Sequence, residues 1–329
     1  MISAFQSITI GVKDVEHSAG FYREFLGFSD VLDDSTDYLE ELEPVIGALI
    51  QARKVTLRDK ISGSVLHIVE HISTKPLPPL APIEWGDTGY LELGLRAFHL
   101  EQLYLDLKSR GVDFITPVRS IDASSGRRGL YTYLRDPDGL LLQLVEIQGG
   151  ERPRVAGIGH VGVGVGDMKK AQNFYADLLG LEETVYEFKG RFPELDEVTG
   201  GKDMEVALVA RDMAALSPTI KLIHTPGYKG KPILEARRWG DIGIAEIALL
   251  VEDLNVVINR LIAGGVELMN PPAKIRDSSI YLSTPEEAVL KLVEEAEQTP
   301  SAIPPKTLKR ALNRFKESAR TMRTSKQEP

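Results

Sequence analysis

An internal repeat constrains the fold of this 329-residue chain more than any other feature of its sequence. Three pairs of similar segments occur in the same order, at offsets of 153, 154 and 148 residues: 12–28 with 165–181, 84–95 with 238–249, and 130–146 with 278–294. Nearly constant spacing over three anchors indicates a duplicated domain. We therefore expect one domain over residues 1–150, a second over residues 151–297 and a separate C-terminal segment over residues 298–329.

Each copy divides again into two units with the same plan. The first unit opens with an alternation of apolar residues at positions 8–12, which predicts a strand. It continues into a helix, predicted from the spacing of Val15, Phe21 and Phe25 and ended by Gly27. Further strands follow, and the second unit repeats the order. The chain thus predicts four units, each a strand, a helix and several strands, which is an α+β fold.

These motifs resemble the vicinal oxygen chelate superfamily, which includes glyoxalase I, ring-cleaving extradiol dioxygenases, methylmalonyl-CoA epimerase and bleomycin resistance proteins. The residues that carry the resemblance are "DVEHSAGFYREFLGF", "DMKKAQNFYADLLGL", two "WGD.G" motifs and "YLRDPDGLLLQLVE". The resemblance covers about residues 5–297. It implies that two βαβββ units form each U-shaped, mostly antiparallel sheet, which cups a metal ion. It implies little about the reaction, because chemistry varies widely on one scaffold.

The resemblance also implies where metal ligands would lie, namely on the first and last strands of each unit. Carried over by position, the eight candidates are Ser7, His67, Glu92, Gln143, His160, Lys221, Glu246 and Lys291. Ser7, Lys221 and Lys291 depart from the family pattern. Of the other five, Glu246 is expected to pair with Lys291, which leaves His67, Glu92, Gln143 and His160 as the metal candidates. Their nitrogen and oxygen donors suit Zn, Ni, Co, Mn or Fe equally, and a metal-free cup is the alternative.

Which units share a cup stays open in the sequence. If the first two units pair, one cup holds Ser7, His67, Glu92 and Gln143. If the second pairs with the third, one cup holds Glu92, Gln143, His160 and Lys221. Either way the remaining cup holds Glu246 and Lys291, which we expect to form an ion pair in place of a metal or to bind substrate.

Glu92 is the principal candidate for a catalytic residue. Its carboxylate stands among Leu91, Leu93 and Leu95, where burial without a polar partner would be costly. By strand parity, Tyr90 and Arg96 share its face and are expected to contact substrate.

Two classes of function follow. The first is a divalent-metal-dependent enzyme of glyoxalase or epimerase type, acting on a small molecule with adjacent oxygens through an enediolate or enolate. The alternative is a metal-free, resistance-type binding protein. A ring-cleaving dioxygenase is disfavoured. Its iron needs two histidines and one carboxylate on one face, and neither domain supplies that set at the candidate positions.

Composition limits the partners. The chain has no cysteine, a net charge of −9 and no apolar run near the roughly 20 residues of a membrane span, so we expect a cytoplasmic protein. An acidic body disfavours nucleic-acid binding and leaves a small molecule as the expected partner. Residues 301–329 hold eight Lys or Arg and two Glu, with an apolar stripe at helical spacing. This basic tail is expected to dock on the body or on the partner subunit of a homodimer.

Overall fold

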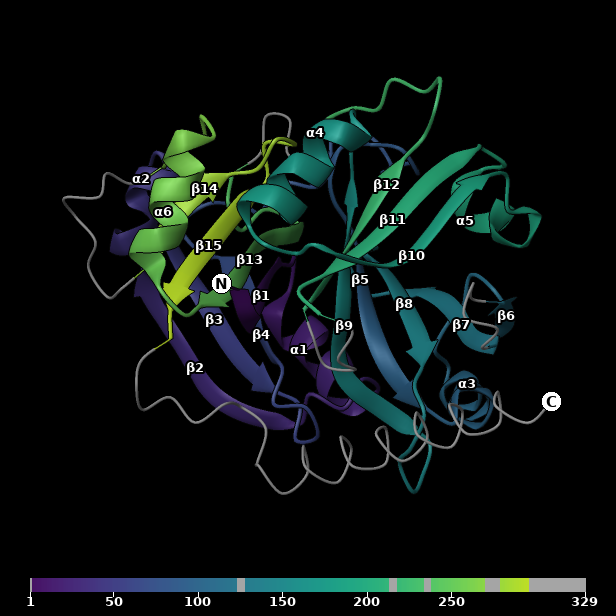
Figure 1. Cartoon of the computed structure of the whole chain (residues 1–329). Helices are drawn as coiled ribbons and strands as arrows, with labels where there is room; N and C mark the ends of the chain where they lie inside the picture. Colours follow the sequence, from purple (N-terminus) through teal and green to yellow (C-terminus); the bar gives the residue numbers. More distant parts are fainter. Residues whose placement is uncertain (1, 123–127, 213–217, 234–237, 270–278, 296–329) are drawn as a thin grey trace.

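The protein, described from a computed structural model, consists of two curled sheets with few helices (Figure 1). The structure describes residues 2–122, 128–212, 218–233, 238–269 and 279–295. The mixed α+β class predicted from the sequence is confirmed. The basic tail predicted over residues 298–329 lies outside the described residues.

The first sheet has seven strands and combines the two ends of the sequence. In spatial order its strands are β14 (Ser279–Ser283), β15 (Val289–Glu294), β13 (Gly243–Val251), β1 (Ile2–Gly11), β4 (Val65–His71), β3 (Gln51–Arg58) and β2 (Asp30–Tyr38). The second sheet has eight strands and uses the middle of the sequence: β10 (Glu183–Gly190), β11 (Met204–Ala210), β12 (Thr219–His224), β9 (Arg154–Gly164), β5 (Gly89–Phe98), β8 (Leu141–Glu146), β7 (Arg128–Arg135) and β6 (Arg119–Asp122).

This strand order settles which units share a sheet. β1 pairs antiparallel with β13, so that Ile8 lies opposite Ile247, and β5 pairs antiparallel with β9. Unit one therefore joins unit four, and unit two joins unit three. A cup made by the first two units would have put His67 beside Glu92, and the structure does not have it. Each sheet draws one unit from each side of residue 150.

The first helix lies where the sequence predicts it, between Val15 and Gly27. The helices and helical turns are α1 (Val15–Glu24), η1 (Glu40–Leu42), α2 (Glu43–Ile46), α3 (Leu100–Ser109), α4 (Met168–Gln172), η2 (Asn173–Leu178), η3 (Pro193–Leu195), α5 (Asp196–Thr199) and α6 (Leu254–Ala263). The Asp14 side chain caps α1 by accepting a hydrogen bond from the His17 amide, and Asp253 caps α6 in the same way. Gly27, at φ 75°, turns the chain just beyond α1.

Strand alternation separates a shared core from two inner faces. Leu66 and Ile68 of β4 enter the large apolar cluster that also includes residues of the helices and of the other sheet. Val69, the next residue along β4, enters a smaller cluster with Trp239 and Tyr281, which we name cup 1. The corresponding face of the eight-stranded sheet carries a cluster with Trp85 and Tyr133, which we name cup 2. The candidate ligands lie in these two cups.

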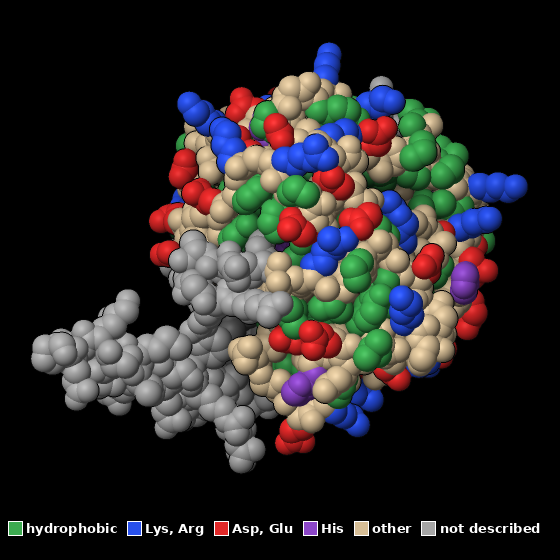
Figure 2. Space-filling view, turned by 90° about the vertical axis from the view of Figure 1, so that its right-hand side faces the viewer, with side chains coloured by type: hydrophobic (Ala, Val, Ile, Leu, Met, Phe, Trp, Pro, Cys, Tyr) green, Lys and Arg blue, Asp and Glu red, His purple; other side chains and the backbone are tan. Residues whose placement is uncertain are grey.

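The surface is mixed in charge. Figure 2 shows acidic and basic side chains interspersed over one face, with small apolar areas between them. Across the described residues, no helix is long and apolar enough to cross a membrane.

Candidate functional site

The centre of cup 2 is built from the antiparallel strands β5 and β9. In their register Glu92 lies opposite Gly162, and Gly94 lies opposite His160. A Cβ atom on Gly162 would overlap the Glu92 side chain, and one on Gly94 would overlap the His160 ring. Each polar side chain therefore occupies space that a glycine on the neighbouring strand leaves open. The glycine alternation of residues 157–165 is what makes room for the site.

Lys221 completes the cluster. It lies on β12 beside Gly162, and its ammonium nitrogen Nζ is 2.6 Å from Glu92 Oε1. The same nitrogen donates to the Tyr133 hydroxyl at 3.1 Å and to Gln143 Oε1 at 3.4 Å. His160 Nε2 lies 3.0 Å from Glu92 Oε1. These contacts use the three hydrogens of the ammonium group.

The cluster holds one buried ion pair. Glu92 is fully buried, which by itself raises the pKa of its carboxyl group, but the Lys221 ammonium and the His160 ring outweigh burial and bring that pKa to about 2. Burial lowers the pKa of His160, although Glu92 opposes this effect. At neutral pH the site therefore contains a carboxylate, an ammonium and a neutral imidazole that donates Nε2–H to Glu92.

Three polar atoms of cup 2 have no partner among the described residues, and one of them is the Tyr131 hydroxyl. Glu92 Oε2 and the indole nitrogen Nε1 of Trp85 are both buried and make no hydrogen bond. The repeat places Trp239 and Glu246 at the corresponding positions of cup 1, where Trp239 Nε1 donates directly to Glu246 Oε2 at 2.9 Å. Cup 2 therefore leaves unsatisfied the same two groups that satisfy each other in cup 1.

Cup 1 holds a different arrangement. His67 Nδ1 is 3.0 Å from the Thr56 hydroxyl, and Ser7 is buried on β1 opposite Ala248. The Lys291 ammonium lies 4.9 Å from the centre of the Tyr281 ring. Burial, followed by the charges of Lys54 and Lys291, lowers the pKa of His67 to about 4.

The expected ion pair between Glu246 and Lys291 is not formed at salt-bridge distance within the described part of the chain. Glu246 bonds to Trp239, and Lys291 lies over Tyr281 instead. Burial raises the pKa of Glu246, and the charge of Lys291 only opposes that rise.

The four metal candidates do not come together. Glu92, Gln143 and His160 share cup 2, whereas His67 is on the other sheet. Nowhere in the described ranges do three His, Cys, Asp or Glu side chains group closely enough to hold a metal ion. With His67 and His160 on different sheets, two histidines and one carboxylate do not meet at either candidate position.

Tyr90 and Arg96, the two residues of β5 expected to contact substrate, do not both share a site with Glu92. A bulge between Tyr90 and Glu92 breaks the parity on which the expectation depended. Tyr90 instead packs in the shared core and donates its hydroxyl to the Val289 carbonyl at 2.9 Å. Arg96 is buried and donates to the Ile158 carbonyl at 2.5 Å.

Sequence reasoning missed Tyr133 and Trp85. Both recur in the second copy, as Tyr281 and Trp239, and an aromatic residue retained at both positions of a repeat was the signal that could have found them.

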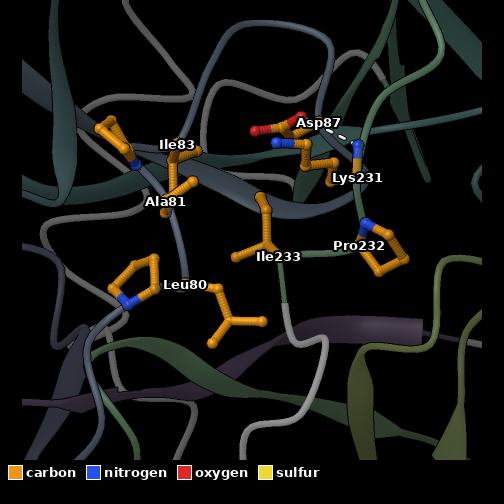
Figure 3. Close-up of a pocket in the computed structure, with 9 residues that line it drawn as sticks. Leu80, Ala81, Ile83, Asp87, Lys231, Pro232 and Ile233 are labelled. Atoms are coloured by element: carbon orange, nitrogen blue, oxygen red, sulfur yellow. Dashed lines mark hydrogen bonds between the residues drawn. The ribbon is translucent and has the colours of Figure 1, made fainter.

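A cavity lies at the edge of cup 2, with which it shares Ile233. It has a volume of about 250 Å³ and is lined by residues 79–83, Asp87 and residues 231–233. Figure 3 shows apolar side chains around it and Asp87 and Lys231 at one end, where Asp87 accepts a hydrogen bond from the Lys231 amide. Glu92 and Lys221 do not line it, and it is small for a ligand pocket.

Comparison with known proteins agrees with this architecture. Residues 157–292 match the model of the Glyoxalase/Bleomycin resistance protein/Dioxygenase superfamily. Glyoxalase I from Zea mays is similar in structure, with a TM-score of 0.60 and 14% identity over 88% of this chain and 92% of that one. A putative dioxygenase from Bacillus subtilis has a TM-score of 0.55 and 15% identity over 92% of this chain and 87% of that one. No curated protein matches the sequence.

Proposed function

We propose that this chain, whose residues 157–292 match the Glyoxalase/Bleomycin resistance protein/Dioxygenase superfamily and whose fold is similar to that of glyoxalase I, is a binding protein. In this proposal its cup 2 takes up a small hydroxyl-bearing molecule without a divalent metal ion. In this proposal Lys221 supplies the positive charge that a metal ion supplies in metal-dependent members.

The residues of cup 2 do not fit a divalent ion. The Lys221 ammonium already stands against the Glu92 and Gln143 oxygens that would hold the metal. A divalent ion within about 4 Å of an ammonium group is repelled by roughly 8 kcal/mol at an effective dielectric constant of about 20. Cup 1 has only two potential metal ligands among the candidate positions, His67 and Glu246, and a third candidate position is occupied by Lys291, whose ammonium does not bind metal.

The unpartnered pair, Glu92 Oε2 and Trp85 Nε1, carries the proposal. An unsatisfied buried polar group costs about 1–3 kcal/mol, so a molecule that satisfies both would be held well. A hydroxyl group suits them, because it accepts from the indole N–H and donates to the carboxylate. The surrounding cluster of Leu91, Leu141 and Ile233 suits an apolar body.

The cluster is within reach of solvent. Gln143 and Lys221 each keep an exposed fraction of 9%, and that of His160 is 7%. The ion pair makes the site neutral, so the preferred ligand is uncharged.

Tryptophan fluorescence tests this proposal, because the chain has two tryptophans and one lies in each cup. Trp239→Phe leaves Trp85 to report on cup 2. Cyclohexanol should change its emission saturably, and cyclohexanone, which only accepts hydrogen bonds, should bind at least about tenfold more weakly.

Glu92→Gln places an amide donor beside the indole and should shift the preference towards cyclohexanone. Equal responses to both probes in both proteins would refute the hydroxyl proposal, and circular dichroism checks that each variant is folded.

The metal-dependent lyase or isomerase is the second candidate, supported by the meeting of Glu92, Gln143 and His160 in one cup. Protein dialysed against a chelator and then given Zn²⁺, Ni²⁺, Co²⁺, Mn²⁺ or Fe²⁺ distinguishes the two. Our proposal expects unchanged thermal stability and little bound metal. One ion bound per chain, with a Tm higher by several degrees, would favour the metalloenzyme.

A further inference from the structure

The two lysines of cup 1, unlike Lys221 in cup 2, are not paired with a carboxylate within the described residues. Lys54 on β3 and Lys291 on β15 are half-buried. Within the described part of the chain, neither ammonium makes a hydrogen bond or lies within 4 Å of a carboxylate. The Lys221 ammonium, by contrast, donates its three hydrogens to Glu92, Tyr133 and Gln143.

The curl of the seven-stranded sheet brings these two lysines to one place. Three strands, β13, β1 and β4, separate β15 from β3, which on a flat sheet would put the two lysines roughly 19 Å apart. Both nevertheless act on the same histidine, His67 of β4, whose pKa they lower in addition to the effect of burial. In the pairing of β3 with β4, Lys54 lies opposite Val69, and Val69 packs in the same cluster as Tyr281, over whose ring Lys291 lies.

Strand parity fixes the direction of Lys54. It stands two residues from Thr56, whose hydroxyl contacts the His67 ring inside cup 1. Lys291 is placed by its 4.9 Å contact with the Tyr281 ring, which belongs to the same cup.

We propose that cup 1 is a second binding site, specific for an anionic group, a carboxylate or a phosphate, held between Lys54 and Lys291. In the tautomer whose Nδ1 accepts the hydrogen of the Thr56 hydroxyl, the His67 ring offers Nε2–H to the ligand as a neutral donor. Glu246 accepts a hydrogen bond from Trp239 and forms no ion pair with Lys291 within the described residues, and burial raises the pKa of its carboxyl group. Two further carboxylates act on the cup: the charge of Asp33 reaches His67, and that of Glu41 reaches Glu246 and Tyr281; both side chains are exposed.

The rest of the cup indicates the remainder of the ligand. Ile50, Val69 and Val289 form apolar walls around Trp239 and Tyr281. A carboxylate or phosphate on an apolar body matches this lining. The inference is independent of the function proposed for cup 2, because the sites share no residue and different tryptophans report on them.

The experiment uses Trp85→Phe, in which Trp239 is the remaining tryptophan. Inorganic phosphate and cyclohexanecarboxylate are titrated separately, with neutral cyclohexanol as the third probe. We expect a saturable change in Trp239 emission with at least one anion, weakened by added salt, and none with cyclohexanol. A response to phosphate alone or to the carboxylate alone supports the site and identifies its ligand class.

Lys54→Met and Lys291→Met, each in the Trp85→Phe background, should weaken the binding at least about tenfold, whereas the arginine variants should retain it. Lys189→Met is the matched control, since Lys189 lies on the other sheet with 73% of its side chain exposed. Circular dichroism identifies a variant that fails to fold, and the arginine variants then carry the test. No response to either anion at about 10 mM, or binding that survives both methionine variants, would overturn the proposal.

Discussion

Replacing Lys221 with methionine should destabilise the protein strongly, because it leaves Glu92 as an unpaired carboxylate in the centre of cup 2. The ordinary pKa of 4.5 for glutamate falls to about 2 in the folded protein. At about 1.4 kcal/mol per pKa unit, the surroundings favour the charged form by roughly 3 kcal/mol at neutral pH. Removing one partner of a buried ion pair typically costs about 3–5 kcal/mol, so Lys221→Met should lose a similar amount.

The loss should depend on pH in a definite direction. In the wild type the folded pKa of Glu92 lies below the unfolded value, so its contribution is present above pH 4.5 and is lost as the pH falls towards 2. In Lys221→Met, burial without the ammonium raises the folded pKa above 4.5. That variant should therefore be weakest at pH 7 and recover relative to the wild type as the pH falls towards 5.

Urea unfolding followed by circular dichroism at pH 7 and pH 5 measures both effects. The double variant Lys221→Met/Glu92→Gln should regain much of the loss, because no buried charge remains. Lys189→Met controls for loss of a surface lysine and should stay within about 0.5 kcal/mol of the wild type. A loss below about 1 kcal/mol for Lys221→Met, or a double variant as weak as the single one, would refute the account of the buried pair.

Two further predictions concern other parts of the fold. Gly94→Ala should cost more than about 2 kcal/mol in the free energy of unfolding, because the new methyl group overlaps the His160 ring; Gly20→Ala, in a helical position with open space, should instead gain about 0.5–1 kcal/mol. Burial raises the pKa of Glu286 from 4.5 to about 7, so its favourable contribution is present below pH 4.5 and is lost as the pH rises to about 7. Glu286→Gln should accordingly gain stability over the wild type across that interval, by up to about 3 kcal/mol in thermal or urea unfolding, and a difference that does not change with pH would contradict this reasoning.

The sequence predicted the units of the fold well because they depend on local patterns. The apolar alternation that begins at Ile8 predicted β1, and Gly27 marked the end of the first helix. Those signals act within a few residues, so one sequence suffices to read them.

Unit pairing and the contents of each cup were harder, because they depend on contacts between distant segments. Both pairings satisfied the same strand patterns, and the register of β1 with β13 decided between them. Tyr90 was misplaced because a bulge, invisible in the alternation, shifts the strand between Tyr90 and Glu92. The expected ion pair of Glu246 and Lys291 is not formed, because Glu246 accepts a hydrogen bond from Trp239 and Lys291 lies over the Tyr281 ring.

The strand order of the two sheets also determines which sheet can be completed first while the chain is synthesised on the ribosome. Every strand of the eight-stranded sheet lies between residues 89 and 224, so that sheet can close once one continuous stretch has emerged. The seven-stranded sheet cannot be completed until β13 has emerged, because Ile8 of β1 pairs with Ile247 of β13. At about 5–20 residues per second, β1 spends roughly 10–50 seconds without its neighbour. During that interval the edge of β1 that later pairs with β13 has no partner strand, and unpaired strand edges favour aggregation.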